Sequence, residues 1–223
     1  MKLTIYNGSP RGLASNSNKI ADFLCEELDD NLTVSRHCIN KTEKHNKDIE
    51  DVAIQDATDA HFIVFPLYAD AMPFAVKLFF EKMEEHKAIF ENKPIYYFIH
   101  SGFPEAKQSR LLERYLKYFT KIIGAQYMGT AIMGNSEMIR YMDEKSKRRA
   151  KIQYNMKAFA KDIETGKPFN KESIEYFRGM ETMPKFVMFL LKKFPSVFNK
   201  GFDMMFKRHD SFDKRYHQTY IWW

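Results

Sequence analysis

Two periodicities of apolar residues alternate along the first 165 residues of the chain. Short apolar runs typical of β-strands lie at 2–6, 32–39, 61–66, 94–100 and 126–133. Between them, apolar residues recur at the three- and four-residue spacing of one helix face. These helical stripes are Ile20, Phe23, Leu24 and Leu28; Ala75, Phe79 and Met83; Leu112, Tyr115, Phe119 and Ile122; and Ile152, Met156, Phe159 and Ile163, with a weaker pattern at 49–58. Five strands alternating with five helices predict an α/β fold whose parallel sheet is covered on both faces.

The composition of the strand runs predicts their places in that sheet. The runs at 61–66 and 94–100 are apolar almost throughout, which indicates the centre, whereas the run at 32–39 is more polar and is expected near an edge. Ligands of such sheets bind beyond the carboxyl ends of the strands. The loops that follow four of the strands are therefore the places to look for a site: 7–17, 66–73, 101–107 and 134–137.

The loop after the first strand is rich in small polar residues and leads into a helix. It is not a Walker A motif, because no Gly-Lys-Ser/Thr follows, and it lacks the third glycine of a dinucleotide fingerprint. A helix N-terminus with nearby hydroxyl, amide and guanidinium donors suits the phosphate of a mononucleotide such as FMN. The candidate phosphate ligands are Ser9, Arg11, Ser15, Asn16 and Ser17. The alternative is a polar turn before a helix capped by Ser15 or Ser17.

Two further loops have the residues that a flat isoalloxazine ring needs at its faces and edge. In the loop PLYADAMP, a backbone N–H near Tyr68 or Ala69 is a candidate donor to the flavin, and the expected wall residues are Pro66, Leu67, Tyr68, Ala69 and Met72. In the loop SGFPEAK, the expected ligand contacts are Ser101, Gly102 and Phe103. The alternatives are an ordinary turn with Tyr68 half exposed and a tight turn before a helix near Glu105. The polar loop 134–137 is expected only to border the site.

Bulk properties exclude several classes of protein. The 223 residues, 44% hydrophobic and 15% aromatic, suffice for one domain with an appendage. No apolar run approaches the roughly 20 residues that span a bilayer, and the N-terminus lacks the apolar segment of a signal peptide. Cys25 and Cys38 do not suggest a disulfide framework, so a reducing cytoplasm is expected. No catalytic triad or metal-ligand set is evident, and His100, at a strand end, is interpreted as a structural histidine with a ring-edge donor as the alternative.

Residues 166–223 differ from the rest of the chain and are expected to form a helical extension. The chain becomes more basic toward its C-terminal end: residues 140–223 carry 19 Lys and Arg against 10 Asp and Glu, whereas residues 1–139 carry 16 against 19, and the whole chain has a net charge of +6. Aromatic and Met clusters interleaved with lysine pairs predict short amphipathic helices near 184–194 and 196–207. Three roles remain open: a lid or homodimer contact, a peripheral membrane contact, and binding of a protein partner. Nucleic acid is not an expected partner, because the basic residues do not form a separate face.

Three motifs in this order resemble the NADPH-dependent FMN reductase branch of flavodoxin-like proteins. They are GSPRGLASNS followed by NKIADFL, PLYADAMPFAVKLFFEKM, and SGFPE, and the resemblance covers residues 1–165. It implies a flavodoxin-like three-layer sandwich with strand order 2-1-3-4-5, with FMN held by the loop residues named above. Two departures are Ser15-Asn16-Ser17 in place of a glycine-led triplet, and Asp70-Ala71 where a glycine is common. The iron–sulfur members of the branch carry a cysteine cluster that this chain lacks.

The resemblance implies a hydride transfer from NAD(P)H through bound FMN to a quinone, flavin or similar small acceptor, in a cytoplasmic and dimeric enzyme. Such chemistry belongs to the cofactor and needs no catalytic side chain. The alternative is an FMN electron-transfer protein without a nicotinamide site of its own. Electron-carrier flavodoxins are acidic, whereas this chain is basic.

Overall fold

The computed structural model describes residues 1–39 and 58–194. The chain divides into two compact units, Met1–Thr182 and Met183–Trp223, and each is described by itself. The first contains the whole sheet. The weak helical pattern expected at 49–58 and the helix expected at 196–207 fall outside the described residues, apart from Thr58.

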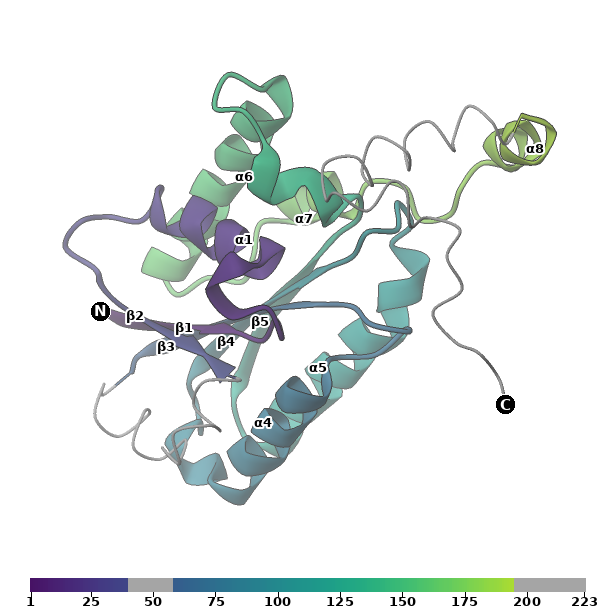
Figure 1. Ribbon diagram of the computed structural model, residues 1–223. Helices are drawn as coiled ribbons and strands as arrows, with labels where there is room; N and C mark the ends of the chain where they lie inside the picture. Colours follow the sequence, from purple (N-terminus) through teal and green to yellow (C-terminus); the bar gives the residue numbers. More distant parts are fainter. Residues whose placement is uncertain (40–57, 195–223) are drawn as a thin grey trace. The chain divides into compact units, whose positions relative to one another are not determined.

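The sheet has five parallel strands in the order β2-β1-β3-β4-β5 (Figure 1). The strands are β1 (Lys2–Asn7), β2 (Thr33–Cys38), β3 (Ala60–Pro66), β4 (Pro94–His100) and β5 (Gln126–Met133). All five lie where the apolar runs predict them. The order confirms the flavodoxin-like fold, and the fully buried β3 lies at the centre while the more polar β2 forms an edge.

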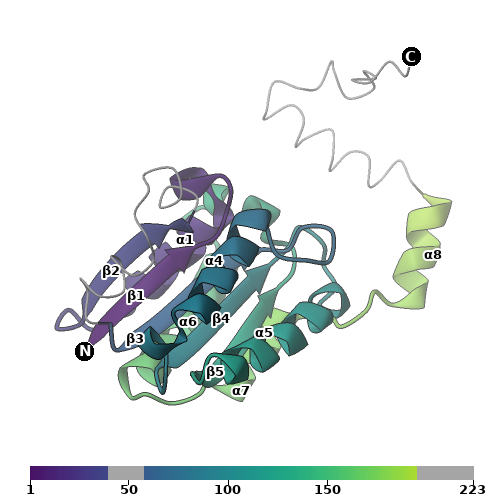
Figure 2. The same cartoon turned by 90° about the horizontal axis from the view of Figure 1, so that it is seen from below.

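Helices cover both faces of the sheet, as Figure 2 shows. α1 (Asn16–Cys25), α6 (Lys147–Glu164) and α7 (Lys171–Arg178) lie on one face, and α4 (Phe74–Glu85) and α5 (Arg110–Ile122) on the other. Successive strand residues point to opposite faces. In β3, Phe62 and Val64 therefore belong to the core under α1 and α6, whereas Ile63 and Phe65 belong to the core under α4 and α5.

The compact unit continues beyond residue 165, where the extension was expected to begin. Phe169 stacks on Phe159 of α6 with ring centroids 3.9 Å apart, and Phe177 of α7 packs on Phe98 of β4. Phe169 and Phe177 are each 3% exposed. Residues 166–182 thus complete the core on the α1 side of the sheet, because the apolar face of the short helix α7 needs the sheet as its partner.

The second unit contains the helix α8 (Lys185–Lys193), which confirms the helix expected near 184–194. Phe186, Met188 and Phe189 are exposed on it, and Lys192 and Lys193 lie in its last turn. No helix within the described ranges is both long and apolar enough to cross a lipid bilayer.

Candidate functional site

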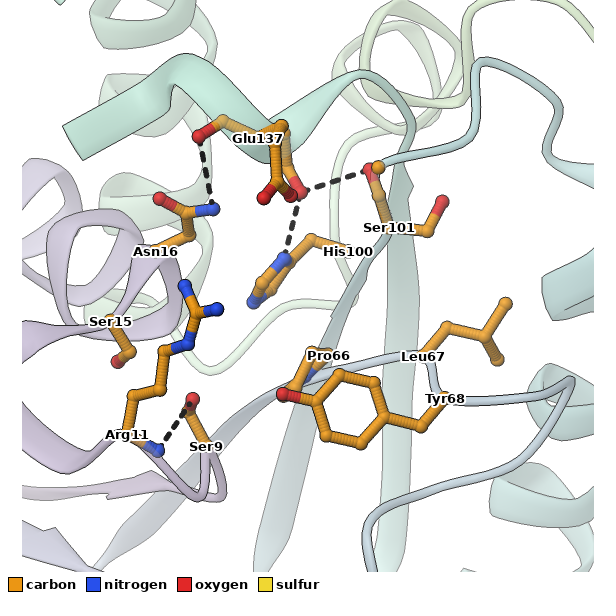
Figure 3. A pocket seen from close by; sticks show the side chains of 12 residues that line it. Ser9, Arg11, Ser15, Asn16, Pro66, Leu67, Tyr68, His100, Ser101 and Glu137 are labelled. Atoms are coloured by element: carbon orange, nitrogen blue, oxygen red, sulfur yellow. Dashed lines mark hydrogen bonds between the residues drawn. The ribbon is translucent and has the colours of Figure 1, made fainter. Parts of the chain in front are cut away.

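A pocket opens at the carboxyl ends of β1, β3 and β4, the edge at which ligands of parallel sheets bind (Figure 3). Nine of the thirteen residues expected from the sequence line it. The lining residues are Ser9, Arg11, Ser15, Asn16, Pro66, Leu67, Tyr68, His100, Ser101, Gly102, Ser136 and Glu137. Loops that are distant in sequence thus meet at one place, as the predicted sheet requires.

The loop after β1 is held by its own hydrogen bonds. Ser15 is the N-cap of α1: its Oγ donates to the carbonyl of Gly12 at 2.6 Å and accepts from the backbone N–H of Asn18 at 3.0 Å. Asn7 Nδ2 donates to the same Gly12 carbonyl at 2.9 Å. The hydroxyl of Ser15 is therefore committed to the cap, as the alternative interpretation of the sequence proposed.

The first turn of α1, which contributes Asn16 to the pocket lining, leaves two backbone donors without a partner in the described part of the chain. Helix geometry gives the backbone N–H groups of Asn16 and Ser17 no partner within the helix, and no other acceptor for them occurs in the described residues. Arg11 is exposed, and Figure 3 shows its guanidinium extending toward Asn16. Two N–H groups, a helix dipole and a guanidinium together favour an anion at this end of the pocket.

Ser17 does not line the pocket, contrary to expectation; it lies beneath the floor with no exposed surface. Its Oγ lies 2.7 Å from His100 Nε2, and His100 Nδ1 lies 2.9 Å from Ser136 Oγ. Ser136 Oγ donates its proton to the carbonyl of Ser101 and so accepts from Nδ1–H. Hence Nε2 carries no proton, and the hydroxyl of Ser17 donates to it. Ser17 can offer an anion its backbone N–H but not its hydroxyl proton.

His100 forms part of the pocket floor and is 4% exposed. Burial lowers its pKa to about 3, so the ring is neutral at physiological pH. Both nitrogens are satisfied by hydroxyl groups, which supports the structural interpretation of this histidine. It links α1 to the segment after β5 rather than presenting a proton to a ligand.

The loop after β3 forms the opposite side of the pocket. The backbone groups of Tyr68 and Ala71 exchange two hydrogen bonds, of 2.8 and 2.9 Å. The two residues between them, Ala69 and Asp70, have φ values of 45° and 64°. This is the left-handed region, which glycine adopts without strain and other residues rarely adopt. Tyr68, 46% exposed, turns its ring to the pocket across from Asn16 (Figure 3).

Two of the expected wall residues and one expected ligand contact do not line the pocket. Ala69 lies at the tip of the turn, Met72 packs against the core under α4, and Phe103 is 63% exposed away from the pocket. The N–H of Tyr68 is also committed to Ala71, so Ala69 is the remaining backbone donor of the expected pair. The tight turn explains the position of Ala69 and the commitment of the Tyr68 N–H, and a linear pattern of residue types does not reveal it.

Glu137 and Ser136 complete the pocket from η4 (Ser136–Tyr141), a 3-10 helix that follows β5. The backbone carbonyl of Glu137 lies 3.5 Å from Asn16 Nδ2, and a Cβ added to Gly102 would lie 3.4 Å from Glu137 Oε2. The sequence indicated this loop only as a border. Its place after the fifth strand of the same sheet edge is the signal that could have included it.

Comparison with known proteins places the chain in a family. The profile of the flavodoxin-like fold family matches residues 1–158. The chain belongs to this family. No curated protein sequence matched it. Within the described ranges, no group of three His, Cys, Asp or Glu side chains could hold a metal ion.

Solved structures of flavodoxin-like proteins resemble the chain at low sequence identity. An oxidoreductase from Corynebacterium diphtheriae is 14% identical, with a TM-score of 0.56, and the match covers 74% of this chain and 96% of that one. An NADPH-quinone reductase from P. pentosaceus is 16% identical, with a TM-score of 0.53 and coverages of 72% and 98%. General stress protein 14 from Treponema denticola, solved in complex with FMN, is 14% identical, with a TM-score of 0.51 and coverages of 73% and 98%. At these identities the likeness shows the fold.

Proposed function

We propose that the protein binds FMN in the pocket of Figure 3 and acts as an NAD(P)H oxidoreductase that reduces a quinone, flavin or similar small acceptor. The observation that carries the proposal is the polarity of this pocket. Anion donors gather at the α1 end, and an exposed aromatic side chain lies at the other. A flavin mononucleotide has the same division, with a dianionic phosphate and a flat ring.

The α1 end fits a phosphate group. The backbone N–H groups of Asn16 and Ser17 would donate to it, and the guanidinium of Arg11 would neutralise part of its charge. Ser9 lines the same loop. Ser15 and Ser17 contribute indirectly, because their hydroxyl protons hold the loop and the floor in place.

The other end fits the edge and face of a planar ring. Pro66, Leu67 and Tyr68 supply apolar and aromatic surface, and Gly102 allows close approach across the pocket. Bound FMN would supply hydride transfer, which the side chains of the chain cannot perform. The residues bind and orient, and the neutral His100 keeps a titrating charge out of the floor.

The family and its structures support the same proposal. One similar structure is named an NADPH-quinone reductase and another contains FMN. The alternative, an FMN electron carrier without a nicotinamide site, keeps the same cofactor site but requires a separate reductase. The formal charge of +6 favours the enzyme, since carriers of this fold are acidic. The cytoplasmic location, the homodimer and the membrane contact of the C-terminal extension stay predictions.

The deciding experiment compares visible spectra before and after anaerobic addition of NADPH to the FMN-loaded protein. We expect NADPH to bleach the flavin absorption on the timescale of a catalytic turnover. Replacing Arg11→Ala and Asn16→Ala together should weaken FMN binding at least roughly tenfold, because the charge-assisted donor of Arg11 and the side-chain amide of Asn16 are lost from the pocket lining, although the backbone N–H of residue 16 remains. Arg114→Ala, which removes an exposed cation on α5, is the matched control for charge.

Each outcome separates the alternatives. Bound flavin that stays oxidised with NADPH, but is reduced through a partner reductase, would support the electron carrier. Equal FMN affinity in the double variant and the Arg114→Ala control would show that the phosphate lies elsewhere. A protein that takes up no FMN would remove both functions.

A further inference from the structure

A second pocket lies at the same edge of the sheet, past the carboxyl end of β5. Its cavity volume is about 240 Å³. It is lined by Pro104, Met133, Gly134, Asn135, Arg148, Tyr176, Phe177, Arg178, Gly179 and Met180. None of the interpretations of the sequence placed a ligand here, because α7 was expected to belong to the extension.

A narrow ridge separates the second pocket from the first. Ser101 and Gly102 line the first pocket and Pro104 the second. The N–H of Asn135 donates to the carbonyl of Phe103 at 3.0 Å. A Cβ on Gly134 would lie 2.7 Å from the carbonyl oxygens of Phe103 and Pro104, so only glycine allows this contact. The loop from Ser101 to Pro104 is therefore a wall common to both pockets.

Two arginines reach the second pocket from different helices. Arg148, near the start of α6, donates to the carbonyl of Asn135 at 2.7 Å. Arg178 lies in the last turn of α7. Among the described residues, neither forms an ion pair with a carboxylate, whereas Arg110 and Arg149 of the same unit do.

Arg178 has an unsatisfied donor. Its Nε is buried without a hydrogen-bond partner in the described part of the chain. A cation in the last turn complements the dipole of α7, which accounts for the charge. It does not account for the Nε, because a buried donor without an acceptor is destabilising unless a ligand supplies the acceptor.

The pocket also offers surface for a planar group. Tyr176 is 36% exposed, and Met180 and Pro104 lie in the same lining. Arginine forks match the oxygen atoms of a phosphate, and an aromatic ring beside them can stack on a base. Phosphate and base together are the recognition elements of a nucleotide.

We propose that this pocket binds a phosphate monoester of adenosine, with the phosphate on Arg148 and Arg178 and the base against Tyr176. Two sources share this chemistry: the 2′-phosphate end of NADPH and a separate 5′-mononucleotide. The first rests on the proposed reductase function, because only then does a dinucleotide extend from the flavin pocket across the ridge. It would make the second pocket the determinant of NADPH over NADH.

The test uses the full chain without flavin and three probes in calorimetric titrations: 2′-AMP, 5′-AMP and adenosine. We expect a phosphorylated probe to bind at least roughly tenfold more tightly than adenosine, and Arg178→Met to remove that difference. Methionine keeps the apolar stem of the side chain. Lys171→Met, an equal loss of charge on the exposed start of α7, should leave binding unchanged.

The two sources give different results. Preference for 2′-AMP, with a roughly tenfold rise in the KM for NADPH but not for NADH in flavin-loaded Arg178→Met, supports the dinucleotide. Preference for 5′-AMP supports a separate mononucleotide. Equal affinity for all three probes, or the same affinity in Arg178→Met as in Lys171→Met, overturns the site. Because these titrations need no flavin, failure of the proposed reductase would appear separately, as a flavin that NADPH does not bleach.

Discussion

Two buried histidines at opposite ends of the sheet show how the same side chain serves different purposes. His61 lies near the start of β3 and His100 at the end of the neighbouring strand β4. Burial lowers the pKa of each to about 3, with Lys93 adding to the effect at His61. Both rings are neutral at physiological pH. Yet His100 has a hydroxyl on each nitrogen, whereas neither nitrogen of His61 has a partner in the described residues.

The surroundings of each ring explain the difference. His61 lies among aromatic rings, with centroids 5.8 Å from Tyr6 and 5.1 Å from Phe90, and so acts as a flat packing group. His100 lies where three loops converge, and its bonds to Ser17 and Ser136 hold the pocket floor. The two rings are both structural but differ in what they hold: His61 packs between aromatic rings, and His100 joins segments of the pocket floor through both nitrogens.

Acidification should lower the free energy of unfolding more than any of the substitutions below. The reason is that the pKa of both histidines is lowered only in the folded state. Each has an ordinary pKa near 6.5 and a folded pKa of about 3, so the unfolded chain binds more protons between these values. Their contribution is complete above about pH 6.5 and is lost as the pH falls toward 3. From pH 6 to pH 4 the two together should lower the free energy of unfolding by up to about 5 kcal/mol.

Urea denaturation at a series of pH values measures this loss. The double variant His61→Phe and His100→Phe is the control, since the carboxylates that titrate in the same range remain. A pH dependence as steep in the double variant as in the wild type would contradict the assignment.

Single replacements should separate the two histidines. At pH 7.5, His100→Phe leaves the Ser17 hydroxyl without its acceptor and Ser136 without its donor. It should lower the free energy of unfolding by about 2–4 kcal/mol. His61→Phe replaces an unpartnered polar ring by an apolar ring of similar shape and should change it by less than about 1 kcal/mol, in the stabilising direction. An equal loss of unfolding free energy in the two variants, measured by urea denaturation, would contradict the distinction between the two histidines.

A smaller loss than in His100→Phe is expected from removing one hydroxyl, which leaves one nitrogen of His100 without a partner, as in His61. Ser17→Ala leaves Nε2 without a donor and should lower the free energy of unfolding by about 1 kcal/mol. Ser146→Ala, at the start of α6, is the control because that side chain makes no capping bond. In a His100→Phe background the effect of Ser17→Ala should disappear, and an undiminished effect would show that the two residues do not act together.

The order of elements could be predicted because it depends on patterns within short segments. The apolar run of β3 indicates a strand, and the apolar stripe Ile152–Ile163 indicates a helix, each from its own residues. The parallel topology then places the loops that follow the strands at one edge of the sheet. What could not be predicted depends on contacts between distant segments. The sequence predicts Ser17 as a phosphate ligand, but its hydroxyl donates a hydrogen bond to His100. It predicts α7 as part of an extension, but Phe177 packs on Phe98 of the sheet.

The turn at residues 68–71 illustrates a further limit. The sequence predicts that Ala69 contacts the flavin, because it lies beside Tyr68 in the loop. The paired hydrogen bonds of Tyr68 and Ala71 instead place it at the tip of a turn, with a positive φ. A non-glycine residue in that conformation stores strain of order 1–3 kcal/mol, which sequence periodicity does not detect.

The hydrogen bonds of His100 also fix when the first pocket comes into existence during folding. Ser17 and His100 are 83 positions apart, and Ser136 lies 36 positions beyond His100. The loop after β1 leaves the ribosome early, but its floor is complete only after the segment following β5 has been synthesised. A ligand that needs this floor binds once that segment is in place. It then stabilises the folded structure by mass action.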